Sequence, residues 1–149
     1  MIKVKTKNFG SIEVEEEKVI KFKNQILGFD DYNKFTIIDS LDDEVFYWLQ
    51  SIEEEELSFM MVNPFDFVDN YEIDLLDKEL DLIDASEKSE LYVYTLVVAN
   101  KGKIRTNLKA PIVINQDNKK AGQFVLRKEY PTRYYLLGSE QEAENADSK

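Results

Sequence analysis

The chain has 149 residues, 43% of them hydrophobic, a net charge of −11 and neither cysteine nor histidine. This length suits one domain, and the lack of cysteine excludes a disulfide-stapled fold. Without cysteine and histidine the chain also lacks the commonest general base, the thiolate nucleophile and the usual transition-metal ligands, which favours a binding protein over an enzyme.

The first half of the chain predicts a series of short strands. Residues 2–6 and 12–16 alternate in polarity on either side of a turn at 9–11, which predicts a hairpin. Apolar runs bounded by acidic or turn residues predict further strands at 19–22, 35–38, 46–50, 57–62 and 71–75. The N-terminus lacks the apolar core of a signal peptide, and no apolar run is long enough to span a membrane. We therefore expect a cytoplasmic protein with no membrane contact.

The second half predicts one short helix and several more strands. Leu76, Leu80 and Ile83 fall at helical spacing, which predicts a helix over 77–83 with Asp77 as its cap. Further strands are predicted at 91–98, 104–108, 112–114 and 123–127, with turns at 101–103 and 118–122. The run 110–114 indicates a short buried strand entered through a proline kink.

Many short strands and one short helix predict a mostly-β fold, a small antiparallel β-barrel-like single domain over residues 1–138. We expect the central strands to be buried on both faces. The residues predicted to be largely buried are Trp48, Val93, Leu96, Ile112 and Ile114. Residues 139–149 contain four acidic residues and no large apolar residue, which predicts a disordered acidic tail.

Acidic residues are concentrated in the middle of the chain. Residues 39–90 hold 18 acidic residues and 2 lysines, a charge of −16, whereas 1–38 carry +1 (7 basic, 6 acidic) and 91–149 carry +4 (10 basic, 6 acidic), which sums to −11. Direct nucleic-acid binding needs a basic face, so the middle segment argues against it. It favours a basic protein partner, with plain solubility as an equally open alternative.

Two other function classes stay open. A carboxylate-dependent hydrolase needs two converging acids, but the glutamates at 53–56 repel one another and predict a solvated surface loop. An OB-like nucleic-acid-binding barrel would use the aromatic and basic segment 130–137, for which we favour a strap across the barrel. The acidic residues at 74–84 lack calcium-loop spacing, so no metal site is predicted there. No catalytic residue and no cofactor site is predicted either.

The order of motifs resembles the FliW family of flagellar assembly factors over about residues 1–130. The matching pieces are Phe22 followed by 26–29, then 46–51, Asn63-Pro64-Phe65, Tyr71, the helix after Asp77, 93–98, and 107–115 with Gln123 beyond. The chain departs from the family's usual residues at three positions, where it has Lys23, Gln25 and Asn63.

The resemblance implies a non-enzymatic regulator that binds flagellin and antagonises the RNA-binding translational repressor CsrA. Flagellin that accumulates in the cytoplasm would hold the factor. Export of flagellin would free the factor to bind CsrA and relieve repression of flagellin translation. We expect a monomer when the protein is free of partners, and no direct nucleic-acid binding.

The two partners are expected to use different surfaces. For CsrA the acidic segment around the helix is the candidate, with Asp69, Glu72, Asp74, Asp77 and Asp81 as contacts. For flagellin, whose terminal segments are amphipathic helices, an apolar surface is needed. The candidates for that surface are Phe65, Phe67, Val68, Leu108, Pro111 and Ile112.

Overall fold

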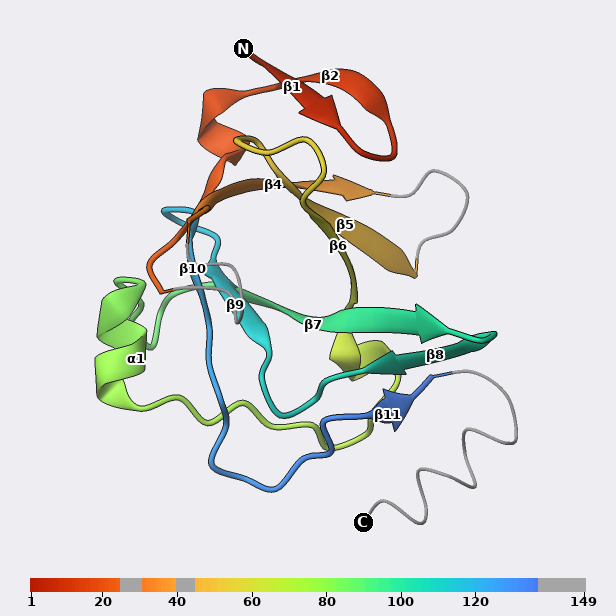
Figure 1. The fold of residues 1–149 in the computed structure, drawn as a ribbon. Coiled ribbons are helices and arrows are strands. Elements are labelled where there is room, and N and C mark those ends of the chain that lie inside the picture. The colour runs from red at the N-terminus through yellow and green to blue at the C-terminus, as the bar shows by residue number, and fades with distance from the viewer. Residues whose placement is uncertain (25–30, 40–44, 137–149) are drawn as a thin grey trace.

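The computed structural model describes residues 1–24, 31–39 and 45–136, and its centre is a closed β-barrel (Figure 1). The barrel strands are β3 Ile20–Phe22, β4 Lys34–Asp39, β5 Phe46–Ser51, β6 Ser58–Val62, β7 Leu91–Asn100, β9 Ile112–Asn115 and β10 Lys120–Gln123. Their order is β7-β6-β5-β4-β3-β10-β9, and the pairing of β9 with β7 closes the sheet. The predicted barrel is therefore confirmed, although β3 and β10 pair in parallel while the other neighbours are antiparallel.

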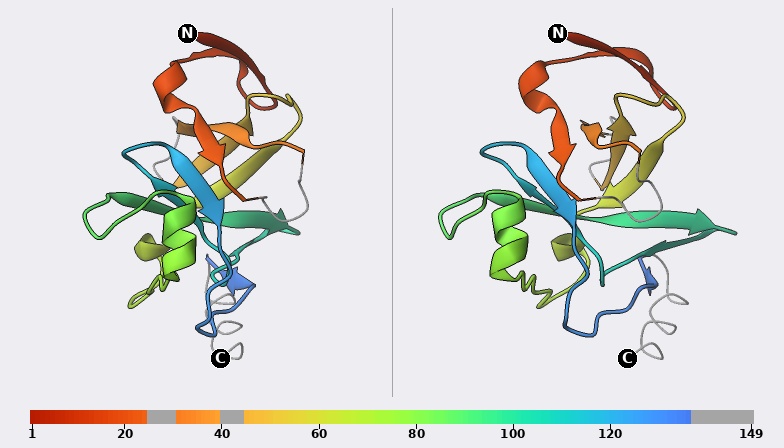
Figure 2. Two further views of the ribbon diagram at one scale, coloured as in Figure 1. Left: turned by 90° about the vertical axis from the view of Figure 1, so that its left-hand side faces the viewer. Right: turned by 60° about the vertical axis from the view of Figure 1, so that its left-hand side comes forward.

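The remaining elements surround this barrel. They are the hairpin β1 Ile2–Thr6 and β2 Gly10–Val14, the short helices η1 Glu16–Lys18, η2 Pro64–Asp66 and α1 Asp77–Leu82, and the strands β8 Lys103–Thr106 and β11 Tyr134–Tyr135. Figures 1 and 2 place the β1–β2 hairpin at one end of the barrel, and α1 and the β7–β8 hairpin on opposite sides of it. Among the described residues, no helix has the length and apolar character needed to cross a membrane.

Strand β7 organises the lower half of the barrel because it pairs with three other strands. Its first half pairs with β9, where Val93 lies opposite Val113, and its second half pairs with β8, where Val97 lies opposite Thr106. The other edge of β7 pairs with β6. The segment between β8 and β9 contains Pro111, whose ring supplies no ladder donor, and the chain bends there as predicted.

The apolar run of β9 is buried on both faces. Ile112 and Ile114, 0% and 1% exposed, point into the barrel interior with Phe35, Leu49 and Met61. Val113, also 0% exposed, faces the opposite way into a second cluster beneath the outer segments. This second cluster consists of Tyr71, Ile83, Val93, Leu108, Val113, Phe124 and Leu126. A strand covered on both sides needs consecutive apolar residues, which explains the composition of this run.

Val93, Ile112 and Ile114 are buried as predicted, whereas Trp48 and Leu96 are half-buried and so less enclosed than these three. Trp48 points away from the barrel interior because its neighbour Leu49 points into it. Leu96 packs against the interior cluster but also borders an open hollow of about 290 Å³.

Two predicted strands differ from the structure. Residues 71–75 are extended but pair with no strand. The last barrel strand is β10, and not 123–127, because the turn before it is tighter than predicted. Lys119 adopts a left-handed conformation with φ of 61°, and Asn118 Oδ1 accepts a hydrogen bond from the Lys120 amide at 2.9 Å. The segment that starts at Phe124 is thereby free to cross the outside of the barrel.

The glutamates at 53–56 lie in the surface turn between β5 and β6, as predicted. Gln50, 1% exposed, supports this turn because its Nε2 donates to the carbonyls of Glu55 and Leu57 at 3.1 and 3.2 Å. Its Oε1 accepts from the Lys7 amide at 3.2 Å, so one side chain connects the turn to the N-terminal hairpin.

Replacing Gln50 by leucine should lower the free energy of unfolding by about 1–3 kcal/mol, because the carbonyls it serves would lose their partner. Chemical denaturation measures this loss. Glu55→Gln in the same turn is the control and should change stability by no more than about 0.5 kcal/mol, since Glu55 is exposed. Equal effects of the two variants would contradict the structural role of Gln50.

Candidate partner-binding surface

Residues 69–82, which we call the acidic arm, cross the outside of the barrel from η2 to the end of α1 (Figure 1). Tyr71 anchors the arm: it is 5% exposed, and its hydroxyl donates to the Leu108 carbonyl at 2.7 Å. Burial raises the pKa of the Tyr71 hydroxyl above its ordinary value, so it remains a proton donor. The arm therefore has a buried anchor although it pairs with no strand.

Helix α1 begins with a contact that the sequence did not suggest. Leu76 is the N-cap residue, and its amide donates to Glu79 Oε1 at 2.8 Å. The prediction of Asp77 as the cap is wrong because Asp77 is the first helical residue, whereas a glutamate at the third helical position can reach back. After α1, Ile83 is 0% exposed, and its carbonyl accepts from Asn115 Nδ2 at 3.1 Å.

The acidic candidates all lie exposed on the arm. They are Asp69, Glu72, Asp74, Asp77 and Asp81. Of these, Glu72 forms an ion pair, with Lys128 at 3.5 Å. In the part of the chain that the structure describes, no cation forms an ion pair with the carboxylates of the other four. Their charges therefore face solvent along one continuous segment.

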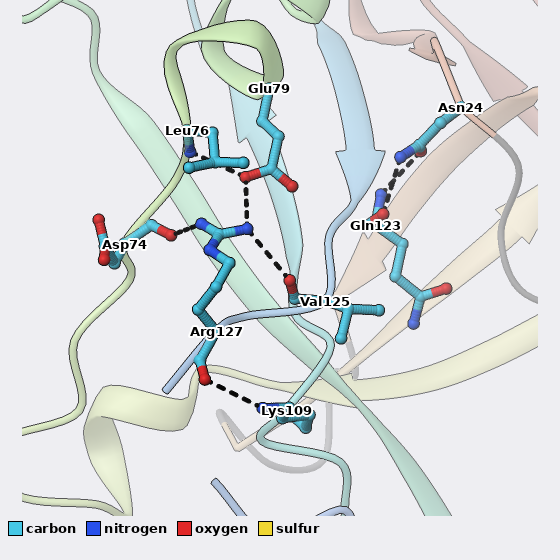
Figure 3. Close-up of polar contacts among 8 residues, drawn as sticks. All are labelled: Asn24, Asp74, Leu76, Glu79, Lys109, Gln123, Val125 and Arg127. Carbon is cyan, nitrogen blue, oxygen red and sulfur yellow. Dashed lines mark hydrogen bonds and ion pairs between the residues drawn. The ribbon is translucent and has the colours of Figure 1, made fainter. Parts of the chain in front are cut away.

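A second segment, residues 124–133, lies against the arm, and we call it the strap. Arg127 Nη1 donates to Glu79 Oε1 at 2.9 Å, and Arg127 Nη2 donates to the Asp74 carbonyl (Figure 3). Tyr130 Oη accepts from the Glu72 amide at 2.8 Å, and its ring lies 4.7 Å from that of Tyr71. The segment 130–137 was expected to be a strap, and a terminal strand is the alternative arrangement for such a segment. The described part contains both, since β11 pairs with β8.

Arg127 and Glu79 are the structural residues of this surface that the sequence did not reveal. They are separated by 48 positions, and no local spacing predicts a pair over such a distance. The N-cap was also not predicted. The usual capping motif has Ser or Thr at the N-cap position, whereas this helix has Leu76 there, and only the Glu79 half of the motif is present. The signal that was available is the helical spacing that placed Glu79 in the first turn.

A smaller ion pair lies beside the end of α1. Lys120 Nζ contacts Asp84 Oδ2, and this hydrogen bond and charge lower the pKa of the Asp84 carboxyl. A general acid needs a raised pKa, so the lowered pKa of the Asp84 carboxyl does not suit that role. Among the described residues, no three His, Cys, Asp or Glu side chains are placed to hold a metal ion.

Three of the apolar candidates are core residues. Leu108 and Ile112 are 1% and 0% exposed, and Pro111 is also buried. As candidates for an accessible apolar surface these three are contradicted, because β9 is covered on both faces and Leu108 lies under the strap, where its amide bonds to the Pro131 carbonyl at 3.1 Å. For Ile112 the burial agrees with its separate prediction as a core residue.

The other three apolar candidates are accessible. Phe65 is 49% exposed, and Phe67 and Val68 are half-buried. The Phe65 ring lies 5.6 Å from that of Tyr71, the anchor of the acidic arm. The structure thus places accessible apolar side chains beside the acidic arm and removes the candidates near β9.

These features define a class of protein: a small β-barrel domain whose outer layer carries an exposed acidic segment. The model of the family described as FliW protein matches residues 3–136. The flagellar assembly factor FliW of Alkaliphilus metalliredigens is 40% identical over 138 residues, which cover 90% of this chain and 85% of that protein. That of Ruminiclostridium cellulolyticum is 39% identical over 145 residues, which cover 95% and 98%. The chain belongs to the FliW family.

A solved structure agrees with this assignment. A crystal structure of the flagellar assembly factor FliW has a TM-score of 0.86 and 31% sequence identity, over 93% of this chain and 99% of that chain. The resemblance read from the ordered motifs is therefore confirmed for both family and fold.

Proposed function

We propose that this protein is a cytoplasmic, non-enzymatic flagellar assembly factor that binds flagellin and antagonises CsrA. Its membership of the FliW family supports the role in flagellar assembly. The exposed acidic arm is the observation that carries the CsrA part of the proposal. The free protein is a monomer that contacts neither nucleic acid nor membrane.

The acidic arm suits a partner that grips RNA phosphates. Such a protein must be basic near its RNA-binding face, and opposite charges steer two proteins together. Asp69, Asp74, Asp77 and Asp81 keep their carboxylates in solvent and form no ion pair within the described part of the chain. An acidic arm docked beside the basic face would repel RNA without filling the RNA site.

Flagellin binding is assigned to the accessible apolar residues Phe65, Phe67 and Val68. An amphipathic helix binds by placing apolar side chains on an apolar surface. The exposed Phe65 ring supplies such a surface. Because this surface lies next to Tyr71 and the acidic arm, bound flagellin would obstruct a partner on the arm.

The function is tested with the purified full chain, CsrA and flagellin, each pair measured by calorimetry, and with an RNA gel shift for CsrA. We expect binding to each protein, release of RNA from CsrA when this protein is added, and loss of that release when flagellin is in excess. Absence of CsrA binding in low salt would overturn the proposal.

Replacing Phe65 by alanine should weaken flagellin binding about tenfold or more, because truncating an exposed aromatic anchor removes the contacts it makes with a partner. Thermal stability should change little, since Phe65 is already 49% exposed. Calorimetry with flagellin measures the effect. Val98→Ala on the β7–β8 hairpin is the control, because Val98 is equally exposed at 49%. A loss of the same size in both variants would place the flagellin surface elsewhere.

A further inference from the structure

The acidic arm is held in place mainly by side chains. Residues 71–75 pair with no strand; Tyr71 is buried in the second core cluster, and the half-buried Ile73 and Leu75 pack against that cluster. Beyond Tyr71 the backbone is tied at two points to the strap, where the Glu72 amide meets the Tyr130 hydroxyl and the Asp74 carbonyl meets Arg127. A segment without strand pairing depends on such side-chain contacts for its conformation.

Arg127, which lies on the strap, ties the strap to both the extended part and the helix α1 of the acidic arm (Figure 3). Its guanidinium donates to the Asp74 carbonyl on the arm, to Glu79 Oε1 on α1 at 2.9 Å, and to the Val125 carbonyl on the strap at 3.3 Å. The planar guanidinium can serve these acceptors together, which a single ammonium cannot do with the same geometry.

The backbone beneath Arg127 is fixed by the core. The preceding residue, Leu126, is 1% exposed, and its amide donates to the Lys109 carbonyl at 2.8 Å. Lys109 Nζ in turn donates to the carbonyls of Arg127 and Lys128 at 3.4 and 2.9 Å. Arg127 therefore links the arm to a strap whose backbone is anchored in the core by the buried Phe124 and Leu126.

We propose that Arg127 is a positioning residue, which holds the acidic arm in the conformation that a basic partner recognises. This inference rests on the proposed function, in which the arm docks on CsrA. Arg127 bonds the carbonyl of Asp74 and the side chain of Glu79, and Asp77 lies between these two residues, so the carboxylates of Asp74 and Asp77 are presented from a fixed backbone. Fixing them before binding reduces the ordering that association requires.

The positive charge of Arg127 makes the inference testable, because its removal should have two opposite effects on binding. Loss of positioning should weaken binding to a basic partner, whereas loss of a positive charge should strengthen long-range attraction to it. Removing a cation near the arm changes the net charge from −11 to −12, since −11 − 1 = −12, which on its own would favour a basic partner. Lys128 lies on the same strap, with an exposed and longer contact of 3.5 Å to Glu72. Lys128→Gln is therefore the control with the same charge change.

The experiment measures CsrA binding kinetics of the full chain for Arg127→Gln, Lys128→Gln and Arg127→Lys. Lys128→Gln should bind as well as the wild type or faster. Arg127→Gln should bind roughly tenfold or more weakly despite its more favourable charge, the size expected when hydrogen bonds to a charged group are lost. Arg127→Lys, which keeps the charge, should recover only part of this loss.

Hydrogen exchange separates positioning from a general loss of folding. In Arg127→Gln the amides of Leu76 and Glu79 should exchange faster, while those of the barrel strands keep their protection. Equal binding by Arg127→Gln and Lys128→Gln, with wild-type binding intact, would overturn this inference and leave the proposed function standing. Failure of the wild type to bind CsrA would instead overturn the proposed function. Should Arg127→Gln not fold, Arg127→Lys decides, and wild-type affinity in that variant would refute the need for the guanidinium.

Discussion

Replacing Asp74, Asp77 and Asp81 together by asparagine should slow association with CsrA by about tenfold and remove most of its dependence on salt. The change alters the net charge from −11 to −8, since −11 + 3 = −8, and removes three exposed carboxylates from one segment. Exposed charges contribute little individually but together determine the encounter rate. Each added increment of salt should reduce the wild-type rate, since the Debye length is about 8 Å at physiological ionic strength.

Stopped-flow association across a salt series measures this effect. The matched control replaces Glu15, Glu16 and Glu17 by glutamine, which removes the same charge from an exposed segment next to the N-terminal hairpin. If the control slows association as much as the arm variant does, the partner responds to net charge and not to the arm. Unchanged rates in the arm variant would place the interface elsewhere. Asp77 lies in the first turn of α1, so the variant should also lose a few tenths to about 1 kcal/mol of stability.

Replacing Ile112 by alanine should lower the free energy of unfolding by about 2–5 kcal/mol, because it leaves a cavity at a fully buried site. A domain of this size has a total stability of only about 5–15 kcal/mol, so this loss is a large fraction of the total and raises the unfolded fraction of the variant. Any loss of flagellin binding would then reflect the unfolded fraction and not a lost contact.

Chemical denaturation measures the loss of stability. Two further variants test whether the loss comes from the cavity at this buried site. Ile112→Val removes one methylene and should cost about 0.5–1.5 kcal/mol. Val125→Ala, at a side chain that is 54% exposed, should be close to neutral. A stable Ile112→Ala protein that had lost flagellin binding would restore Ile112 as a contact residue and contradict its place in the core.

Prediction from the sequence succeeded where the signal is local. The alternation of the N-terminal hairpin, the β-branched run of β9 and the helical spacing of Leu76 and Leu80 each depend on neighbours a few residues apart. The position of the glutamates at 53–56 in a surface turn follows from their mutual repulsion and needs no knowledge of the fold. The acidic tail predicted at residues 139–149 lies outside the described part, so that expectation stays a prediction.

Local patterns failed where tertiary packing decides exposure. Leu108, Pro111 and Ile112 follow a turn, which suggested partial exposure, but the strap and the barrel interior cover them from two sides. Trp48 is a large aromatic residue of the kind found in cores, yet its side chain points away from the barrel interior because that of its neighbour Leu49 points into it. The exposure of Leu108, Pro111 and Ile112 depends on which segments cover them, and those segments are distant in the chain. The exposure of Trp48 depends on which face of β5 turns toward the barrel interior.

The sequence by itself determined the class of fold, the family and the location of the negative charge, since these follow from residue order and composition. The tertiary structure alone decided how that charge is presented. It placed the strap against the arm, paired Arg127 with Glu79 across 48 positions, and left Asp69, Asp74, Asp77 and Asp81 exposed. The physical reason is that a contact between remote segments depends on closure of the barrel, which brings together residues that share no local pattern.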